Sequence, residues 1–127
     1  MPAMSAGKAR NDFVEHVVET MREFGAVSPK QMFGGWGLYH DGAFFALIIE
    51  DALYLKVDDD NRALFEGAGL SSFVYVTRDG ERIAMSYYQA PPEALESAAM
   101  MTEWARSAYG AALRARSRKP VRRRKSL

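Results

Sequence analysis

Residues 35–57, GWGLYHDGAFFALIIEDALYLKV, contain three largely apolar runs of strand length, at 35–40, 43–50 and 52–57. Asp41-Gly42 joins the first two runs and favours the tight turn of a β-hairpin, because glycine adopts positive φ without strain. Glu50-Asp51 joins the second run to the third. The stretch therefore predicts a three-stranded antiparallel meander, and it decides the class of fold.

The segment before the meander predicts one helix. Residues 11–25 place apolar side chains at helical spacing between charged ones, with Asn11 or Asp12 as the cap. Residues 26–31, AVSPKQ, are interpreted as a connector because Pro29 does not continue a helix.

The segments after the meander predict a second hairpin between two helices. Residues 58–69 favour a short helix, since Asp58 to Asp60 suit its cap and first turn. Residues 72–88 favour a hairpin around Asp79-Gly80, and the residues after Pro91-Pro92 favour a closing helix. The expected order is α–β–β–β–α–β–β–α. It predicts an α+β fold, an antiparallel sheet with helices packed on one side.

Composition excludes several classes of protein. The 127 residues, 48% of them hydrophobic, suit one domain with a core. The sequence has no cysteine, which excludes disulfides, thiolate nucleophiles and zinc–thiolate sites. No apolar run approaches the roughly 20 residues that span a bilayer, and the first residues lack the apolar stretch of a secretory signal. We expect a cytoplasmic protein with no membrane partner.

Basic residues crowd the last fourteen positions, RARSRKPVRRRKSL. This segment holds eight Lys or Arg and no acid, so residues 1–113 keep nine basic against sixteen acidic residues, a formal charge of −7. We predict a flexible N-terminus (1–9), a folded domain (10–113) and a disordered basic tail (114–127). The tail residues expected to attract DNA or RNA phosphates without base selectivity are Arg114, Arg116, Arg118, Lys119, Arg122, Arg123, Arg124 and Lys125. The alternative is a solubilising tail, and no aromatic residue is interleaved to stack on single-stranded bases.

The glycine-rich stretch MFGGWGLYHDG (32–42) looks most like a motif. A P-loop needs a lysine after its last glycine, whereas Leu38 follows Gly37 here. A dinucleotide fingerprint needs a strand before its glycines and a helix after them, and these glycines precede a strand. We interpret Gly34, Gly35 and Gly37 as allowing unusual backbone geometry where the chain enters the sheet. Binding of a ligand or partner is the alternative.

Other polar residues show little pattern typical of catalysis. Consecutive aspartates at 58–60 lack the alternate spacing of a calcium loop. His16 and His40 have no metal-binding spacing, and Ser86 lacks a G-x-S-x-G elbow. We expect no catalytic residue, cofactor or metal.

Aromatic residues offer a candidate interaction surface. Tyr87 and Tyr88 point to opposite faces of a strand, so one is expected in the core and one exposed. We take Trp36 and Tyr88 as the residues of this surface.

Three blocks, MFGGWGLYHDG (32–42), LYLKVDDDNRALFEGAG (53–69) and MSYYQAPPEAL (85–95), together resemble the N-terminal domain of the TfoX/Sxy family over about residues 10–112. The resemblance implies the same α+β fold and a non-enzymatic role. The best-known members regulate natural competence, acting with the cyclic-AMP receptor protein at competence promoters. Those regulators carry a second, helical domain where this sequence has the basic tail, so the resemblance implies a stand-alone member.

The sequence thus predicts a TfoX-like regulatory or adaptor protein that acts by protein–protein contact, in transcription or competence regulation, with a tail that adds nucleic-acid affinity. One alternative is a protein-interaction module, such as a homodimer, with a solubilising tail. The other is a small-ligand-binding or enzymatic domain that uses a pocket lined by Gly34, Gly35, Trp36 and Tyr88.

Overall fold

The computed structural model describes the backbone of residues 11–32 and 34–125, and the side chains of this part up to Ser117. The predicted flexible residues 1–9 lie outside this part. None of its helices is long and apolar enough to cross a membrane.

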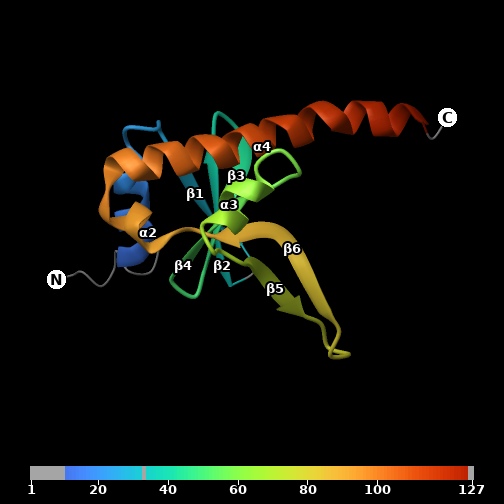
Figure 1. The fold of residues 1–127 in the computed structure, drawn as a ribbon, viewed down its shortest axis with the longest axis horizontal. Helices are drawn as coiled ribbons and strands as arrows, with labels where there is room; N and C mark the ends of the chain where they lie inside the picture. The colour runs from blue at the N-terminus through green and yellow to red at the C-terminus, as the bar shows by residue number, and fades with distance from the viewer. Residues whose placement is uncertain (1–10, 33, 126–127) are drawn as a thin grey trace.

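The fold is a six-stranded antiparallel sheet with its helices in a layer beside it (Figure 1). In chain order the elements are α2 (Asp12–Thr20), β1 (Ser28–Met32), β2 (Gly35–His40), β3 (Ala43–Ile49), β4 (Ala52–Lys56), α3 (Arg62–Gly67), β5 (Ser72–Val76), β6 (Arg82–Gln89), the 3₁₀ helix η1 (Pro92–Glu96) and α4 (Ala98–Lys125). The strand order across the sheet is β1-β2-β3-β4-β6-β5. The α+β class and the expected succession of elements are confirmed, with one strand added.

The added strand is β1, so the interpretation of residues 26–31 as a connector is wrong. Ser28 lies opposite Tyr39, and Met32 lies opposite Gly35, in an antiparallel pair with β2. Pro29 is compatible with this pairing because β1 is an edge strand, where a missing N–H group leaves no ladder incomplete.

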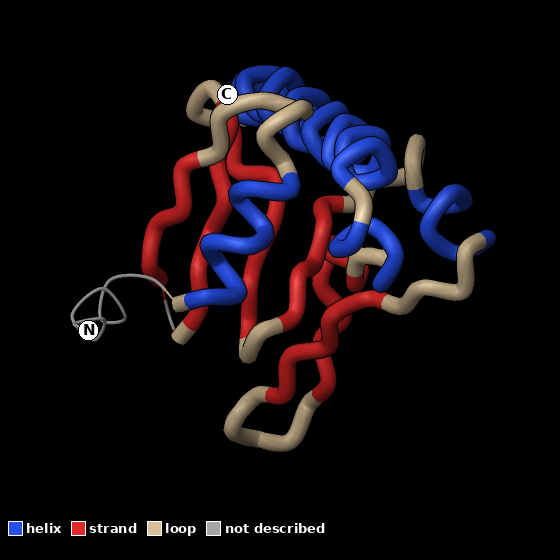
Figure 2. Tube along the Cα trace, turned by 90° about the vertical axis from the view of Figure 1, so that its left-hand side faces the viewer, coloured by secondary structure: helices blue, strands red, loops and turns tan. Residues whose placement is uncertain are grey.

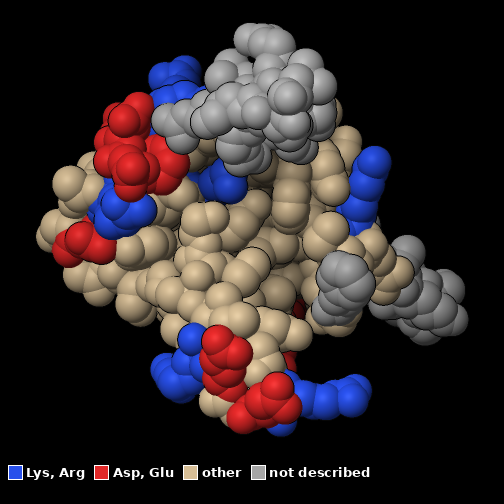
Figure 3. All heavy atoms as spheres, turned by 90° about the vertical axis from the view of Figure 1, so that its right-hand side faces the viewer, with Lys and Arg blue, Asp and Glu red and all other residues tan. Residues whose placement is uncertain are grey.

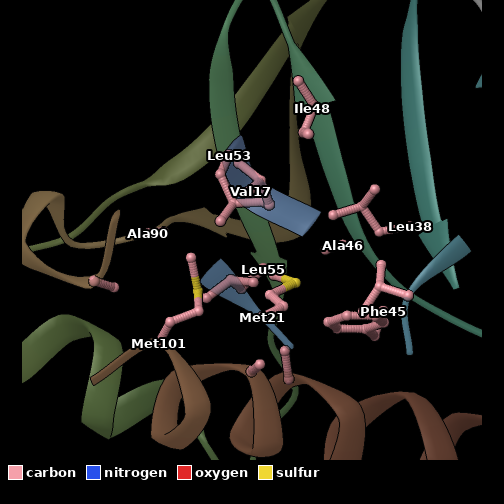
Figure 4. Close-up of a cluster of buried hydrophobic side chains, with 14 of the residues drawn as sticks. Val17, Met21, Leu38, Phe45, Ala46, Ile48, Leu53, Leu55, Ala90 and Met101 are labelled. Carbon is pink, nitrogen blue, oxygen red and sulfur yellow. The ribbon is translucent and has the colours of Figure 1, made fainter. Parts of the chain in front are cut away.

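The helices in the described part of the chain all cover the same face of the sheet. The buried cluster joins Val17 and Met21 of α2, Phe65 of α3 and Met101 of α4 to the inward side chains of β2, β3 and β4. Figure 2 shows α2 lying across the strands, and Figure 4 shows Met21 and Met101 among Leu38, Phe45 and Leu55. Among residues 11–32 and 34–125, no helix lies on the opposite face, which is called the helix-free face below.

Helix α4 crosses the boundary predicted between residues 113 and 114. It runs from Ala98 to Lys125, and its buried positions Ala105, Ala108 and Ala112 face the sheet. Because these side chains are small, the helix axis approaches β3 and β4 closely. The limits of the folded domain at 10–113 and the disorder of the tail stay predictions.

The close approach of β3 to the beginning of β2 requires a glycine at position 35. A Cβ atom at this position would lie 2.4 Å from the backbone oxygen of Ile48 on β3. A side chain would therefore push β2 away from β3, whereas at Gly67 of α3 an added Cβ meets nothing within 4 Å.

We predict that Gly35→Ala lowers the free energy of unfolding by about 1–3 kcal/mol through this steric conflict. The matched control, Gly67→Ala, should leave it unchanged or raise it by up to about 1 kcal/mol, because alanine favours helix. Urea unfolding measures both. Equal stability of Gly35→Ala and the wild type would contradict the strand spacing described here.

Candidate interaction surfaces

Of the glycine-rich stretch, Gly34 lies in a turn before β2, and Gly35 to Gly37 form the beginning of β2. Gly34 has φ +74°, a conformation that suits glycine, and Gly35 pairs with Met32 and Ile49. An open hollow of about 440 Å³ lies beside it, lined by Gln31, Met32, Gly34, Gly35 and Trp36. These lining residues carry no titratable side chain, and Tyr88 is not among them. The hollow therefore lacks the groups that acid–base or nucleophilic chemistry requires.

Trp36 and Tyr88, the residues expected to share an interaction surface, lie apart. Trp36 is on β2 and Tyr88 on β6, with β3 and β4 between them. Both side chains are half-buried and pack against the core from the helix side. The Tyr88 hydroxyl donates to Glu66 over 2.8 Å, and this hydrogen bond raises the pKa of Tyr88. Its neighbour Tyr87 points instead to the helix-free face, where it is buried.

The two histidines have structural partners. The Nδ1 atom of His40 is 2.8 Å from the carbonyl oxygen of Ala26, and its ring lies between Phe24 and Tyr109. His16 joins α2 to η1 through its Nε2 atom, 2.7 Å from the carbonyl oxygen of Leu95. Within the described residues no three His, Cys, Asp or Glu side chains gather in a way that could hold a metal ion.

Asn61 is the buried polar residue that the sequence interpretation missed. Only 7% exposed, it accepts the backbone N–H of Asp58 with Oδ1 over 2.7 Å. Its Nδ2 group donates to the carbonyl oxygens of Lys56 (3.2 Å) and Ser107 (3.1 Å). One amide therefore joins the end of β4, the turn before α3 and the middle of α4. Asp58 stabilises the same turn, since its Oδ1 accepts the N–H groups of Asp60 and Asn61.

Arg114, which was predicted to lie in the basic tail, belongs to this same cluster. Its Nε and Nη2 atoms donate to the two carboxylate oxygens of Asp58 over 2.6 Å and 3.0 Å, and Nε also lies 3.1 Å from Asp60. This bidentate pair lowers the pKa of Asp58 and raises the pKa of Arg114. The guanidinium is thereby engaged in holding α4 and is not available to phosphates without breaking the pair.

The other predicted tail residues are placed only in part. Arg116 is exposed on α4. The side chains of Arg118, Lys119, Arg122, Arg123, Arg124 and Lys125 lie outside the described residues, although the helix backbone continues to Lys125.

The β5–β6 hairpin projects away from the helices (Figure 1) and exposes apolar side chains. Tyr75 and Ile83, which face each other across the hairpin, are 53% and 39% exposed, and Val76 is 54% exposed. Charged residues of both signs gather at the tip of the hairpin, at the lower end of Figure 3. Such an apolar patch with a polar rim is typical of a protein-binding surface.

The fold and these surfaces define a small α+β domain whose described histidines and buried polar side chain serve structural contacts. The chain belongs to the TfoX N-terminal domain family, whose profile matches residues 19–112, and the predicted resemblance is confirmed. It is also 30% identical over 64 residues to the DNA transformation protein TfoX1 of Aliivibrio fischeri. That stretch is 50% of this chain and 31% of the relative, so the chain spans about a third of the relative's length.

We predict that Asp58→Asn lowers the free energy of unfolding at pH 7 by about 1–2 kcal/mol, because the charged hydrogen bonds to Arg114 are weakened. Since Arg114 lowers the pKa of folded Asp58, this stabilisation is present above the unfolded-state pKa of about 4. It is lost as the pH falls through the lower folded-state pKa. Urea unfolding from pH 7 down to about pH 2 should show the difference between wild type and Asp58→Asn shrinking at the acid end.

Asp59→Asn is the matched control, because it removes an exposed ion pair with Arg62 and should change stability by less than about 0.5 kcal/mol. Two outcomes would contradict a stabilising pair between Asp58 and Arg114. One is an equal loss of unfolding free energy in Asp58→Asn and Asp59→Asn. The other is a stability difference between wild type and Asp58→Asn that does not change with pH.

Proposed function

We propose that this protein is a non-enzymatic regulatory or adaptor protein that acts by protein–protein contact, in transcription or competence regulation. The observation that carries the proposal is the exposed apolar patch on one face of the projecting hairpin, formed by Tyr75, Ile83 and Met85. Membership of the TfoX N-terminal domain family and the name of its relative, a DNA transformation protein, support a role in the same process. The proposed partner is another protein, such as a transcription regulator.

We propose further that the basic segment contributes non-specific affinity for DNA or RNA. Seven of its eight cations remain for this role, since Arg114 is paired with Asp58. A cluster of Lys and Arg binds phosphates with strong salt dependence and without base selectivity.

A homodimeric interaction module is the second candidate, and the open edge of β5 favours it. Among the described strands β5 pairs only with β6, and its sequence SFVYV has neither proline nor charge to discourage pairing with another strand. The opposite edge strand, β1, carries Pro29 and Lys30. Two copies joined at β5 would extend the sheet across the dimer.

The nucleic-acid role predicts that a full-length variant without the distal basic residues binds DNA less tightly. In this variant Ser replaces Arg118, Lys119, Arg122, Arg123, Arg124 and Lys125. Retaining Arg114 preserves its pair with Asp58, which truncation after Leu113 would destroy. Binding to duplex DNA should weaken, and the slope of log K against log salt should fall by up to about 5, at about 0.9 for each phosphate that the variant no longer neutralises. Affinity and slope equal to those of the wild type would refute a role for this segment.

The adaptor role predicts that a photo-crosslinking residue at Ile83 captures one defined protein in cells. The same residue at Glu103, exposed on α4, is the control and should not capture it. Ile83→Glu should abolish co-purification of that protein without lowering the unfolding midpoint, because Ile83 is already exposed. Crosslinks from Ile83 to a second copy alone would favour the homodimer, and equal patterns at Ile83 and Glu103 would contradict both.

A further inference from the structure

Helix α4 continues beyond the part that packs on the sheet. Among its described side chains the last buried one is Ala112, whereas Arg116 and Ser117 are exposed. The backbone nevertheless stays helical to Lys125, and Figure 1 shows this end of α4 extending past the other elements. We call residues 116–125 of α4 the basic arm, which as a helix is about 15 Å long.

Side-chain contacts on α4 fix the direction in which the basic arm leaves the domain. Asn61 donates to the backbone carbonyl and the hydroxyl of Ser107, each over 3.1 Å. Arg114, two residues before the arm, is held by both carboxylate oxygens of Asp58. The anchored part of α4 and the arm belong to one continuous helix. A cationic helix held in this way loses less conformational entropy on binding than a flexible tail does.

The charge of the basic arm contrasts with that of the domain. Seven of its ten positions are Lys or Arg and none is Asp or Glu. In a helix these seven positions are distributed around the whole circumference. Residues 1–113 carry a formal charge of −7 and repel a polyanion, so phosphates are attracted to the arm and not to the domain.

We infer that the basic arm binds duplex DNA by lying as a helix in the major groove. This groove is about 12 Å wide and admits an α-helix, whose diameter is about 10–12 Å. Phosphates line both of its walls, which suits a helix with cations on opposite sides. The major groove of an RNA duplex is too narrow for a helix, and an unpaired strand offers no groove. The inference rests on the proposed nucleic-acid role of the basic segment and names duplex DNA as its ligand.

The sequence of the basic arm makes its helix depend on such a ligand. Pro120 has no N–H group to donate to the carbonyl oxygen of residue 116. Like charges four positions apart, as at Arg118 and Arg122, destabilise a helix. Phosphates on both sides neutralise these charges, so binding of a DNA duplex should stabilise the helical conformation of the arm.

The test measures fluorescence anisotropy of the full chain with a labelled DNA duplex, an RNA duplex and single-stranded DNA of one sequence. A variant with Ser117→Gly and Val121→Gly keeps every basic residue but weakens the helix, and Ser117→Ala with Val121→Ala is the matched control that favours it. The glycine variant should bind the DNA duplex about 5- to 25-fold less tightly than the alanine control, since each glycine costs up to about fivefold. Both variants should bind single-stranded DNA equally, and the wild type should prefer the DNA duplex to the RNA duplex.

Hydrogen exchange of the wild-type protein, mapped by mass spectrometry, gives a second readout that does not depend on a variant. Backbone amides of the basic arm should exchange more slowly with the DNA duplex bound than with single-stranded DNA bound. Equal duplex affinity of the two variants, equal affinity of the wild type for the two duplexes, or unchanged exchange in the arm would overturn the inference. Each of these results would leave a flexible cationic tail and the proposed nucleic-acid role. Binding to none of the three ligands would contradict that role as well.

Discussion

The amide of Asn61 holds together three parts of the chain that are distant in sequence. It bonds to Lys56 at the end of β4, to Asp58 in the following turn and to Ser107 in α4, 46 residues away. Arg114, about two helical turns further along α4, pairs with Asp58 in the turn before α3. Because a buried amide without partners is costly, these bonds fix α4 in position and register over the sheet.

The position of α4 determines which face of the sheet becomes a core and which becomes a surface. With α2, α3 and α4 on one side, Leu38, Phe45 and Leu55 are buried, whereas no helix of the described residues covers Tyr39 and Phe44 on the other side. The hairpin β5–β6 extends beyond both layers and exposes Tyr75. The described part of the molecule thus offers surfaces for contact, which suits a regulatory member of the TfoX N-terminal domain family.

Local signals in the sequence predicted most of the fold but little of its surfaces. The meander and the second hairpin followed from Asp-Gly turns and apolar runs, which act over a few residues. β1 was missed because Pro29 argues against a strand unless that strand lies at an edge, and edge position is a property of the whole sheet. The contacts of Asn61 and Arg114 were not predicted, because their partners lie 46 and 56 residues away in sequence. Likewise, alternation alone does not say which of Tyr87 and Tyr88 faces the helices.

The central claim is that all helices of the described residues cover one face of the sheet and leave the other face without a helix. Paramagnetic relaxation by a soluble gadolinium chelate, recorded by NMR on the ring protons of the full chain, measures this exposure directly. We predict strong relaxation at exposed Tyr75, intermediate relaxation at half-buried Tyr39 and Phe44, and weak relaxation at Phe45 and Phe65, which the helices cover. Equal protection of Tyr39, Phe44 and Phe45 would contradict the account, because it would show that both faces of the sheet are covered.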